Sequence, residues 1–488
     1  MTDAAALGAF AALLGASVAL GEGLRWAGWR PESSRRLVHL AVGLSTAACP
    51  LWLSSPAGVY VLALLFVAAN GIAVPRRWLP GMHAITRRSW GTVTFPLALL
   101  LALVLCWTLD PGRVFALQVA FAVLALADPA ASFVGTRVAS PRFAAGGEAK
   151  SVAGSLAFVV VASATAGAGL AWLAPASWGV LPIVAGTATV AALGAVAEAL
   201  GRRGWDNLWI VLAAIVPLAG LEADPSDALL YLLALGTAAA FGVASYRVRF
   251  LDLSGALAAS LLAWIVVAVG GVAWALPAVT FFLLSSLLSR AGRRRKRDAE
   301  ARAAKGSRRD VGQVMANGGI GMLLLALWPF VPSPALYGGF LGSFAAAAAD
   351  TWGTEIGTLV RGPTRHLGIG RRVPPGTSGG VSFAGTLGAA LGAAVVVAVA
   401  APFADLGRGT LGLIVGAGLV GAFVDTVLGA TVQARFWAPD GTLTERDASG
   451  GRPHPLAAGV RAIDNDVVNL VCTASGAALA ALVVGMLG

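Results

Sequence analysis

Two carboxylates, Asp350 and Glu355, close an apolar run in the second half of the chain, and an Arg- and Gly-rich segment, 371–382, follows them. In the first half Asp128 likewise ends an apolar run, and the segment after it ends in Lys150-Ser151. A carboxylate at membrane depth is costly, so it marks a functional site by default. Glycine-rich segments expose backbone N–H groups that bind phosphate. The repeated order of carboxylate and basic glycine segment predicts two phosphate-handling sites, one in each half.

Lys150 and Ser151 stand before an apolar run, where a helix N-terminus leaves backbone N–H groups free for an anion. The lysine adds a positive charge for a phosphate and the serine adds a hydroxyl. The segment is not a Walker A loop, because Ala149 precedes the lysine where that motif has glycine. A basic helix cap at a membrane boundary is the alternative. The predicted phosphate contacts here are Ser151, Gly154 and Ser155.

The segment 371–382 contains two prolines that stiffen the chain and glycines that let a phosphate approach the backbone closely. A plain turn between two spans is the alternative. The predicted phosphate contacts in this segment are Arg372, Gly376, Thr377, Ser378, Gly379, Gly380 and Ser382.

Further acidic side chains accompany each loop, without a cluster of His or Cys. Hard oxygen ligands of this kind suit Mg²⁺ that bridges substrate phosphates rather than zinc. An ion pair with a nearby arginine is the alternative for any single acid. The candidate metal ligands are Asp128, Glu198 and Asp206 in the first half, and Asp350, Asp425, Asp464 and Asp466 in the second.

One histidine joins these groups as a candidate. His39 follows Arg36 closely, and it either binds phosphate together with Arg36, acts as a base on an alcohol, or caps a helix at the interface. Phosphoryl transfer asks a protein mainly to position groups and to neutralise charge. The candidate catalytic residues are therefore Asp128, Lys150, Asp350, Glu355 and His39.

The composition is that of an integral membrane protein. The 488 residues are 57% hydrophobic and only 12% charged, and apolar runs of about 18 residues or more recur throughout. The net charge of +11 is attributed to membrane topology and to anionic lipid head groups. Nucleic acid is not an expected partner, because the basic segment 290–309 lacks interleaved aromatic residues.

The apolar runs predict sixteen transmembrane spans. Lys and Arg lie almost entirely in the loops after odd-numbered spans, with Arg113 and Arg408 as the exceptions. The positive-inside rule then makes those loops cytoplasmic and puts both termini outside, in a multi-pass protein of the plasma (inner) membrane. The predicted spans start near Ala4, Leu37, Ala57, Gly91, Val114, Val152, Ser177, Asn207, Asp227, Leu251, Ala273, Gly312, Pro334, Gly380, Arg408 and Val467.

The polar landmarks recur in the same order in both halves, which predicts a parallel repeat. An acid lies near the end of each fifth span, a candidate phosphate loop follows, an acid lies in each seventh span, and an Asp-Asn pair opens each eighth. The expected fold is an all-α integral membrane protein with two parallel eight-helix halves, residues 1–221 and 227–488. Both sites would face the cytoplasm.

The first half resembles the dolichol kinase and phytol kinase family, which is related to membrane cytidylyltransferases. The resemblance rests on Arg35-Arg-Leu-Val-His39, the segment from Met82 to Arg87, Ala127-Asp128-Pro129, Lys150-Ser151-Val-Ala-Gly154-Ser155, Glu198 and Asp206-Asn207. It implies phosphorylation of a long-chain prenol with CTP and Mg²⁺, and it adds Arg36, Arg87 and Asn207 to the phosphate contacts. Val152 departs from the family, which has an acid at that position.

The second half resembles the phytyl-phosphate kinase family, formerly an uncharacterised membrane family that includes transmembrane protein 19. The resemblance implies phosphorylation of a prenyl monophosphate to the diphosphate, and it adds Arg309, Gln313, Asn317, Asn465 and Asn469 to the nucleotide or phosphate contacts. The matching segments are Arg309-Asp310-Val-Gly-Gln313-Val-Met-Ala-Asn317, Ala349-Asp350 to Glu355, Val373 to Thr386, Asp425 to Gln433, and Asp464-Asn465-Asp466-Val-Val-Asn469.

The sequence therefore predicts a bifunctional kinase that converts a prenyl alcohol (phytol, geranylgeraniol or farnesol) to its monophosphate and then to the diphosphate. A nucleoside triphosphate, CTP in the first place, would be the donor. A cytidylyltransferase that forms a CDP-lipid is one alternative, although it leaves the second half unexplained. A secondary transporter with two repeats is another, although transporters place their sites near the bilayer midplane.

Overall fold

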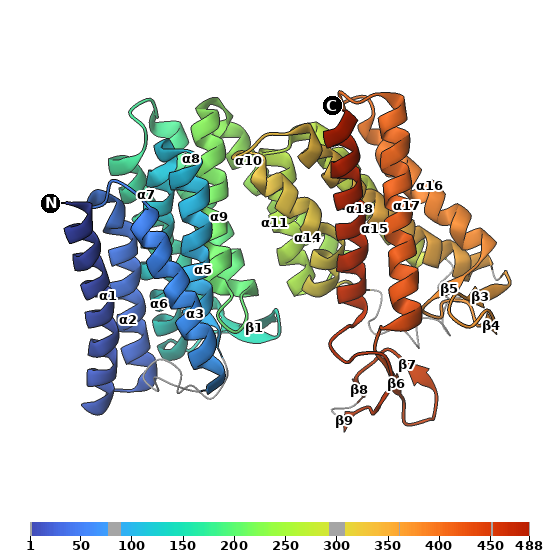
Figure 1. Cartoon of the computed structure of the whole chain (residues 1–488), viewed down its shortest axis with the longest axis horizontal. Coiled ribbons are helices and arrows are strands. Elements are labelled where there is room, and N and C mark those ends of the chain that lie inside the picture. The colour runs from blue at the N-terminus through green and yellow to red at the C-terminus, as the bar shows by residue number, and fades with distance from the viewer. Residues whose placement is uncertain (1, 77–88, 292–307, 361, 450–451, 488) are drawn as a thin grey trace. The chain divides into compact units, whose positions relative to one another are not determined.

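The computed structural model describes residues 2–76, 89–291, 308–360, 362–449 and 452–487. The chain forms two compact units, residues 1–236 and 237–488, called unit 1 and unit 2 below. The division falls within helix α10 (Ala228–Arg247), a few residues after the expected boundary at 221–227. Figure 1 shows helices throughout both units, with short strands confined to the connections.

Eight α-helices of the described residues precede α10, together with four short 3₁₀ or π segments. The α-helices are α1 (Asp3–Trp26), α2 (Pro31–Ala48), α3 (Ala57–Arg76), α5 (Gly91–Leu103), α6 (Val114–Arg137), α7 (Val152–Leu173), α8 (Val180–Leu200) and α9 (Asp206–Ala223). The short segments are η1 (Cys49–Leu51), η2 (Val104–Thr108), η3 (Pro111–Arg113) and η4 (Pro225–Asp227).

Seven α-helices of the described residues follow α10. They are α11 (Leu253–Ala268), α12 (Gly271–Arg290), α14 (Val311–Leu327), α15 (Pro334–Val360), α16 (Phe383–Ala400), α17 (Arg408–Thr431) and α18 (Asn465–Leu487).

The connections carry small antiparallel sheets that the sequence did not predict. In unit 1 the strands β1 (Arg142–Ala145) and β2 (Glu148–Ser151) form a hairpin between α6 and α7. In unit 2 a three-stranded sheet lies between α15 and α16, and further strands lie between α17 and α18 (Figure 1). The unit 2 strands are β3 (Thr364–His366), β4 (Arg372–Val373), β5 (Gly380–Val381), β6 (Arg435–Trp437), β7 (Leu443–Thr444), β8 (Ala448–Ser449), β9 (Arg452–Pro453) and β10 (Leu456–Ala458).

The described ranges contain sixteen α-helices, one at each predicted span, which confirms the predicted helices but not that all sixteen cross the membrane. Within those ranges, 12 helices are long and apolar enough to cross a membrane. Two of the others, α11 and α14, are apolar but shorter. The remaining two, α2 and α15, carry several of the predicted site residues. The chain is an all-α, multi-pass membrane protein, and its orientation in the bilayer stays a prediction.

One helix is central in each unit. In unit 1, α6 packs against α2, α7 and α9, and in unit 2, α15 packs against α12, α14, α16, α17 and α18. Small residues permit this crowding, because they let helix backbones approach closely in a membrane protein. The run Ala345–Ala349 of α15 is completely buried. Asp128 and Asp350 therefore lie on the most enclosed helix of their units.

In unit 1 three segments that are distant in the sequence meet at one end: the start of α5, the β1–β2 hairpin and the α8–α9 connection. The backbone N–H of Trp90, just before α5, donates to the carbonyl of Arg203 in the α8–α9 connection at 2.6 Å. The N–H of Arg203 donates to Oε1 of Glu148 in the β1–β2 hairpin at 3.1 Å. This end, called the site end, brings the landmarks of distant segments together.

Arg113, one of the two basic residues outside the expected loops, is neutralised locally. It is buried, and its Nε lies 2.8 Å from Oε2 of Glu222 and 3.3 Å from Oδ2 of Asp110. The pair joins η3 to the last turn of α9. The exception to the charge segregation is thus a structural ion pair.

The contact between α15 and α18 predicts how unit 2 responds to one added methyl group. A Cβ on Gly342 would lie 2.4 Å from the carbonyl oxygen of Gly476, whereas a Cβ on Gly416 of α17 would meet nothing within 4 Å. We expect Gly342→Ala to destabilise the protein by about 1–3 kcal/mol through overpacking. Gly416→Ala should be neutral or stabilise by up to about 1 kcal/mol, as alanine does in helices.

Thermal unfolding of both variants in one detergent checks this prediction. An equal melting temperature for the two alanine variants would contradict the close α15–α18 contact.

Candidate functional site

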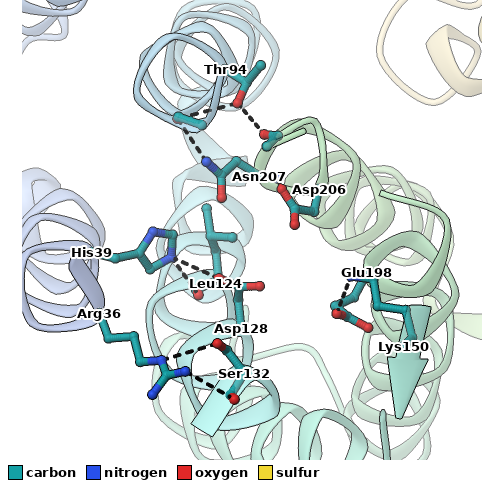
Figure 2. A network of polar contacts seen from close by, with 12 residues as sticks. Arg36, His39, Thr94, Leu124, Asp128, Ser132, Lys150, Glu198, Asp206 and Asn207 are labelled. Carbon is teal, nitrogen blue, oxygen red and sulfur yellow. Dashed lines mark hydrogen bonds and ion pairs between the residues drawn. The ribbon is translucent and has the colours of Figure 1, made fainter. Parts of the chain in front are cut away.

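In unit 1, helix α2 holds α6 on both sides of Asp128. One turn before the aspartate, Nε2 of His39 lies 3.1 Å from the carbonyl oxygen of Leu124. One turn after it, Nε of Arg36 donates to Oγ of Ser132 at 3.1 Å, and its NH2 group donates to the Ser132 carbonyl at 3.2 Å. Figure 2 shows the Asp128 carboxylate between these two contacts.

The contact of His39 fixes the state of its ring. A carbonyl oxygen only accepts, so the Nε2 that faces Leu124 carries the proton. The same Nε2 lies 3.8 Å from Oδ2 of Asp128. A base at this position would have to use Nδ1. The predicted residues Arg36 and His39 are thus brought to Asp128, where both bind the main chain of α6.

Lys150 and Glu198 form a close ion pair at the site end. Nζ of Lys150 lies 2.6 Å from Oε1 of Glu198, and the side chains are only 15% and 10% exposed. Burial disfavours the ammonium, but the charge and hydrogen bond of Glu198 outweigh it, so the pKa of Lys150 lies above its ordinary value. Lys150 is therefore a permanent cation, and its charge also acts on Asp128 and Asp206.

The first turn of α9 completes this group. Asn207 is buried, and its Nδ2 donates to the carbonyl of Gly91 at 2.9 Å, while the hydroxyl of Thr94 donates to the carbonyl of Gly204. These bonds tie α9 to the start of α5. Figure 2 shows Asp206, Asp128 and Glu198 turned toward the same region between the helices.

The loop residue Ser151 is the N-cap of α7, and its Oγ accepts from the backbone N–H of Gly154 at 3.1 Å. The capped turn presses against α6. A Cβ on Gly135 would lie 2.6 Å from Oγ of Ser151, and a Cβ on Gly154 would lie 2.9 Å from the carbonyl oxygen of Ala131. Only glycine at both positions allows this approach. Oγ of Ser155, one turn into α7, is buried without a hydrogen-bond partner among the described residues.

The same contact recurs in unit 2. Ser382 caps α16, and its Oγ accepts from the N–H of Gly385 at 3.1 Å. A Cβ on Gly357 would lie 3.1 Å from Oγ of Ser382, and a Cβ on Gly385 would lie 2.9 Å from the carbonyl oxygen of Gly353. Gly357 follows Asp350 by seven residues, as Gly135 follows Asp128. The two units share one arrangement of carboxylate, glycine and capped turn.

Two carboxylates meet directly in unit 2. The side chains of Asp350 on α15 and Asp425 on α17 lie within hydrogen-bonding reach of each other. The remaining oxygen of Asp425, Oδ2, is buried without a hydrogen-bond partner among the described residues. The charge of Glu355 lies near enough to interact electrostatically with both Asp350 and Arg309.

The predicted glycine loop of unit 2 is built on the sheet β4–β3–β5 and rests against the end of α17. Gly379 has a φ of +76°, and a Cβ there would lie 2.6 Å from Cα of Ala430. The hydroxyl of Ser378 lies 2.6 Å from Oε1 of Glu445 and 3.1 Å from Oε1 of Gln433. The loop is therefore fixed to the α17–α18 connection.

Several predicted contacts of unit 2 have structural partners. Gln313 forms a capping box with Asp310 at the start of α14, and Asn317 donates to the carbonyl of Gln313 at 2.9 Å. The Thr377 hydroxyl donates to the carbonyl of Pro374 at 2.7 Å, and Oδ1 of Asp464 accepts from the N–H of Val467 at 3.0 Å.

The other predicted residues lie in the same connections or outside the described residues. Arg372 is exposed on β4, and Gly376 and Gly380 stand in the loop and on β5. The first helical turns of α18 carry Asn465, Asp466 and Asn469. Arg87 lies outside the described residues.

The described residues contain no group of three or more His, Cys, Asp or Glu side chains that could hold a metal ion. A Mg²⁺ ion needs only one or two carboxylates when substrate phosphates supply further oxygens. The adjoining Asp350 and Asp425 carboxylates fit this requirement. In unit 1, Glu198 is committed to Lys150, which leaves Asp128 and Asp206 for such a role.

Three residues at these sites escaped prediction as site residues. The positive charge of Arg35 interacts electrostatically with Asp128, and Nε of Arg35 is buried without a hydrogen-bond partner among the described residues. Its place in the segment Arg35-Arg-Leu-Val-His39 was a usable signal. Gln433 likewise ends the segment from Asp425, which is one of those that carry the family resemblance. Glu445 lies in a polar connection without local signal, and only the fold brings it to Ser378.

The chain is similar to three known proteins, one of which is named as an enzyme. Protein PGR of Arabidopsis thaliana is 32% identical over 280 residues, which cover 51% of this chain and 94% of that protein. The phytol kinase of a Synechocystis species is 32% identical over 218 residues, covering 44% of this chain and 91% of that enzyme. The Uncharacterized membrane protein MJ0933 of Methanocaldococcus jannaschii is 30% identical over 190 residues, covering 38% and 76%.

No solved structure matches the chain significantly. The protein family described as Integral membrane protein DUF92 matches residues 236–477, which is nearly all of unit 2. On this match and on the extent of the relatives, the chain belongs to the integral membrane protein DUF92 family.

Proposed function

We propose that the protein is a membrane kinase with two active sites, which phosphorylates a prenyl alcohol in unit 1 and the resulting monophosphate in unit 2. The observation that carries the proposal is the recurring contact between a central-helix carboxylate segment and a serine-capped turn. It places Asp128 and Asp350 in the same local setting, seven residues before a glycine that admits the next helix. The similarity to a phytol kinase supports the substrate class.

In unit 1 the substrate is an uncharged alcohol, and the residues suit its activation. The alcohol oxygen attacks the γ-phosphorus of the donor, the bond to the leaving nucleotide breaks, and Asp128 accepts the alcohol proton. Lys150 offers a permanent positive charge for donor phosphate, while Arg36 and His39 hold the helix that carries Asp128. Glu198 holds the lysine in place.

In unit 2 the acceptor is already an anion, so neutralising charge matters more than removing a proton. The adjoining carboxylates of Asp350 and Asp425 would hold Mg²⁺, which neutralises phosphate charge when bound. Arg309, near Glu355, is the neighbouring cation, and the loop 376–382 offers backbone N–H groups. CTP is the proposed donor for both steps, and both sites would face the cytoplasm.

One chain with both sites has a kinetic advantage. The prenyl monophosphate stays in the membrane near the second site, so its effective concentration there is high. A transporter of the same shape would not consume nucleotide, and a cytidylyltransferase would release pyrophosphate. Nucleotide consumption and product analysis with CTP and a panel of prenols therefore test the proposal against both.

Asp128→Asn should slow phosphorylation of the alcohol by about 100-fold or more, because the amide cannot accept the proton. Conversion of added prenyl monophosphate should continue, since unit 2 shares no residue with this site. Chromatography of both reactions in purified protein checks the result. Wild-type rates of monophosphate formation would rule out the assignment of Asp128.

Asp350→Asn should give the reciprocal result. Prenyl monophosphate should accumulate from alcohol and CTP, because the pair that Asp350 forms with Asp425 loses one carboxylate for Mg²⁺. A time course of alcohol, monophosphate and diphosphate measures it. Normal diphosphate formation, or loss of both steps in a folded variant, would contradict two separate sites.

Lys150→Ala should lower kcat/KM for the nucleotide in the alcohol step by about 100-fold, as expected for loss of a phosphate-binding charge. The variant also leaves a carboxylate unpaired, which destabilises a buried site. The double variant Lys150→Ala/Glu198→Gln removes that second effect. Recovery of normal kinetics in the double variant would assign Lys150 a structural role only.

A further inference from the structure

Ser378 contacts two side chains of the α17–α18 connection. Its Oγ lies 2.6 Å from Oε1 of Glu445, which follows β7, and 3.1 Å from Oε1 of Gln433, which follows α17. Gln433 is 2% exposed, so its carboxamide is enclosed by protein. One hydroxyl thus joins the glycine loop to two points of the α17–α18 connection.

Main-chain contacts surround this cluster. Gly379, next to Ser378, lies against Ala430, and its carbonyl accepts from the N–H of Leu367 at 2.9 Å. A Cβ on Gly429 would lie 3.2 Å from the N–H nitrogen of Gly379. Gly429 stands one helical turn after Asp425 on α17. The position of the loop relative to the Asp350–Asp425 pair therefore depends on this junction.

The single proton of the Ser378 hydroxyl determines which groups in this cluster donate and which accept. A serine hydroxyl has one proton and can donate to one partner only. The short distance and the charge of Glu445 favour donation to its carboxylate. Gln433 must then donate to Ser378 through Nε2, after a half-turn of its amide. That turn also gives Nε2 an acceptor, whereas it is otherwise buried without a partner among the described residues.

We propose that Gln433, Ser378 and Glu445 form a directed hydrogen-bond chain, called the loop latch, that positions the glycine loop over the Asp350–Asp425 pair. Its order is Gln433 amide to Ser378 hydroxyl to Glu445 carboxylate. The three are positioning residues, and the inference rests on the proposed function of unit 2. Since the Ser378 hydroxyl is used within the latch, backbone N–H groups of the loop would bind the phosphate.

The direction of the latch gives isosteric tests. Gln433→Glu places two carboxylates on a single hydroxyl proton, whereas the exchange Gln433→Glu/Glu445→Gln restores one donor and one acceptor. The first readout is hydrogen–deuterium exchange of the segment 376–382 in the full chain. The second is kcat and KM for prenyl monophosphate with CTP.

We expect Gln433→Glu to raise exchange of the loop and to lower kcat of the second step by about tenfold or more, because small misplacements are costly in transfer reactions. The alcohol step should not change. The exchanged double variant should recover both loop protection and kcat. A general folding defect would instead lower the yield of active protein and leave the double variant as impaired as the single one.

Unchanged loop protection in Gln433→Glu, or no recovery in the double variant, would overturn the latch. If Gln433→Glu does not fold, Ser378→Ala and Ser378→Thr replace it, and only the threonine, which keeps the hydroxyl, should preserve loop protection. A wild-type protein that forms no diphosphate would overturn the proposed function. In that case the exchange data alone would still decide whether the latch exists.

Discussion

The close contact between each central helix and the first turn of the helix that follows it governs the arrangement of both sites. Serine caps the turn, glycine opens the space, and backbone meets backbone across the interface. The contact fixes where the connection after the carboxylate re-enters the helical bundle. It therefore sets the distance between an acid on α6 or α15 and the loop that precedes α7 or α16.

The two units share this contact but differ in the side chains that surround their carboxylates. Unit 1 uses a lysine, bound to Glu198, and pins α2 to the main chain of α6 on either side of Asp128. Unit 2 has Val381 before its capping serine, where unit 1 has Lys150, and it brings two carboxylates together instead. In the proposed function, an uncharged acceptor in unit 1 and an anionic acceptor in unit 2 would require such a difference.

Hydropathy and charge segregation predicted all sixteen helices, because the period and length of apolar runs carry that information. The same signals cannot reveal two-residue strands, so the sheets between α15 and α16 and between α17 and α18 were missed. The sequence motifs identified Asp128, Lys150, Asp350 and Asp425 as site residues. Their partners depend on tertiary contacts: nothing near Glu445 in the sequence indicates Ser378, and nothing near Ser132 indicates Arg36.

The composition of α15 has a consequence for biogenesis. This helix is not among the candidate membrane spans identified by length and apolar composition, since it carries Asp350, Glu355 and a run of alanine and glycine. An aspartate near a helix centre opposes insertion by about 2.5–3.5 kcal/mol. Its neighbours must supply the missing stabilisation, and α18, which is synthesised after it, is among them. Stable integration of α15 is thus expected only once α18 has been synthesised.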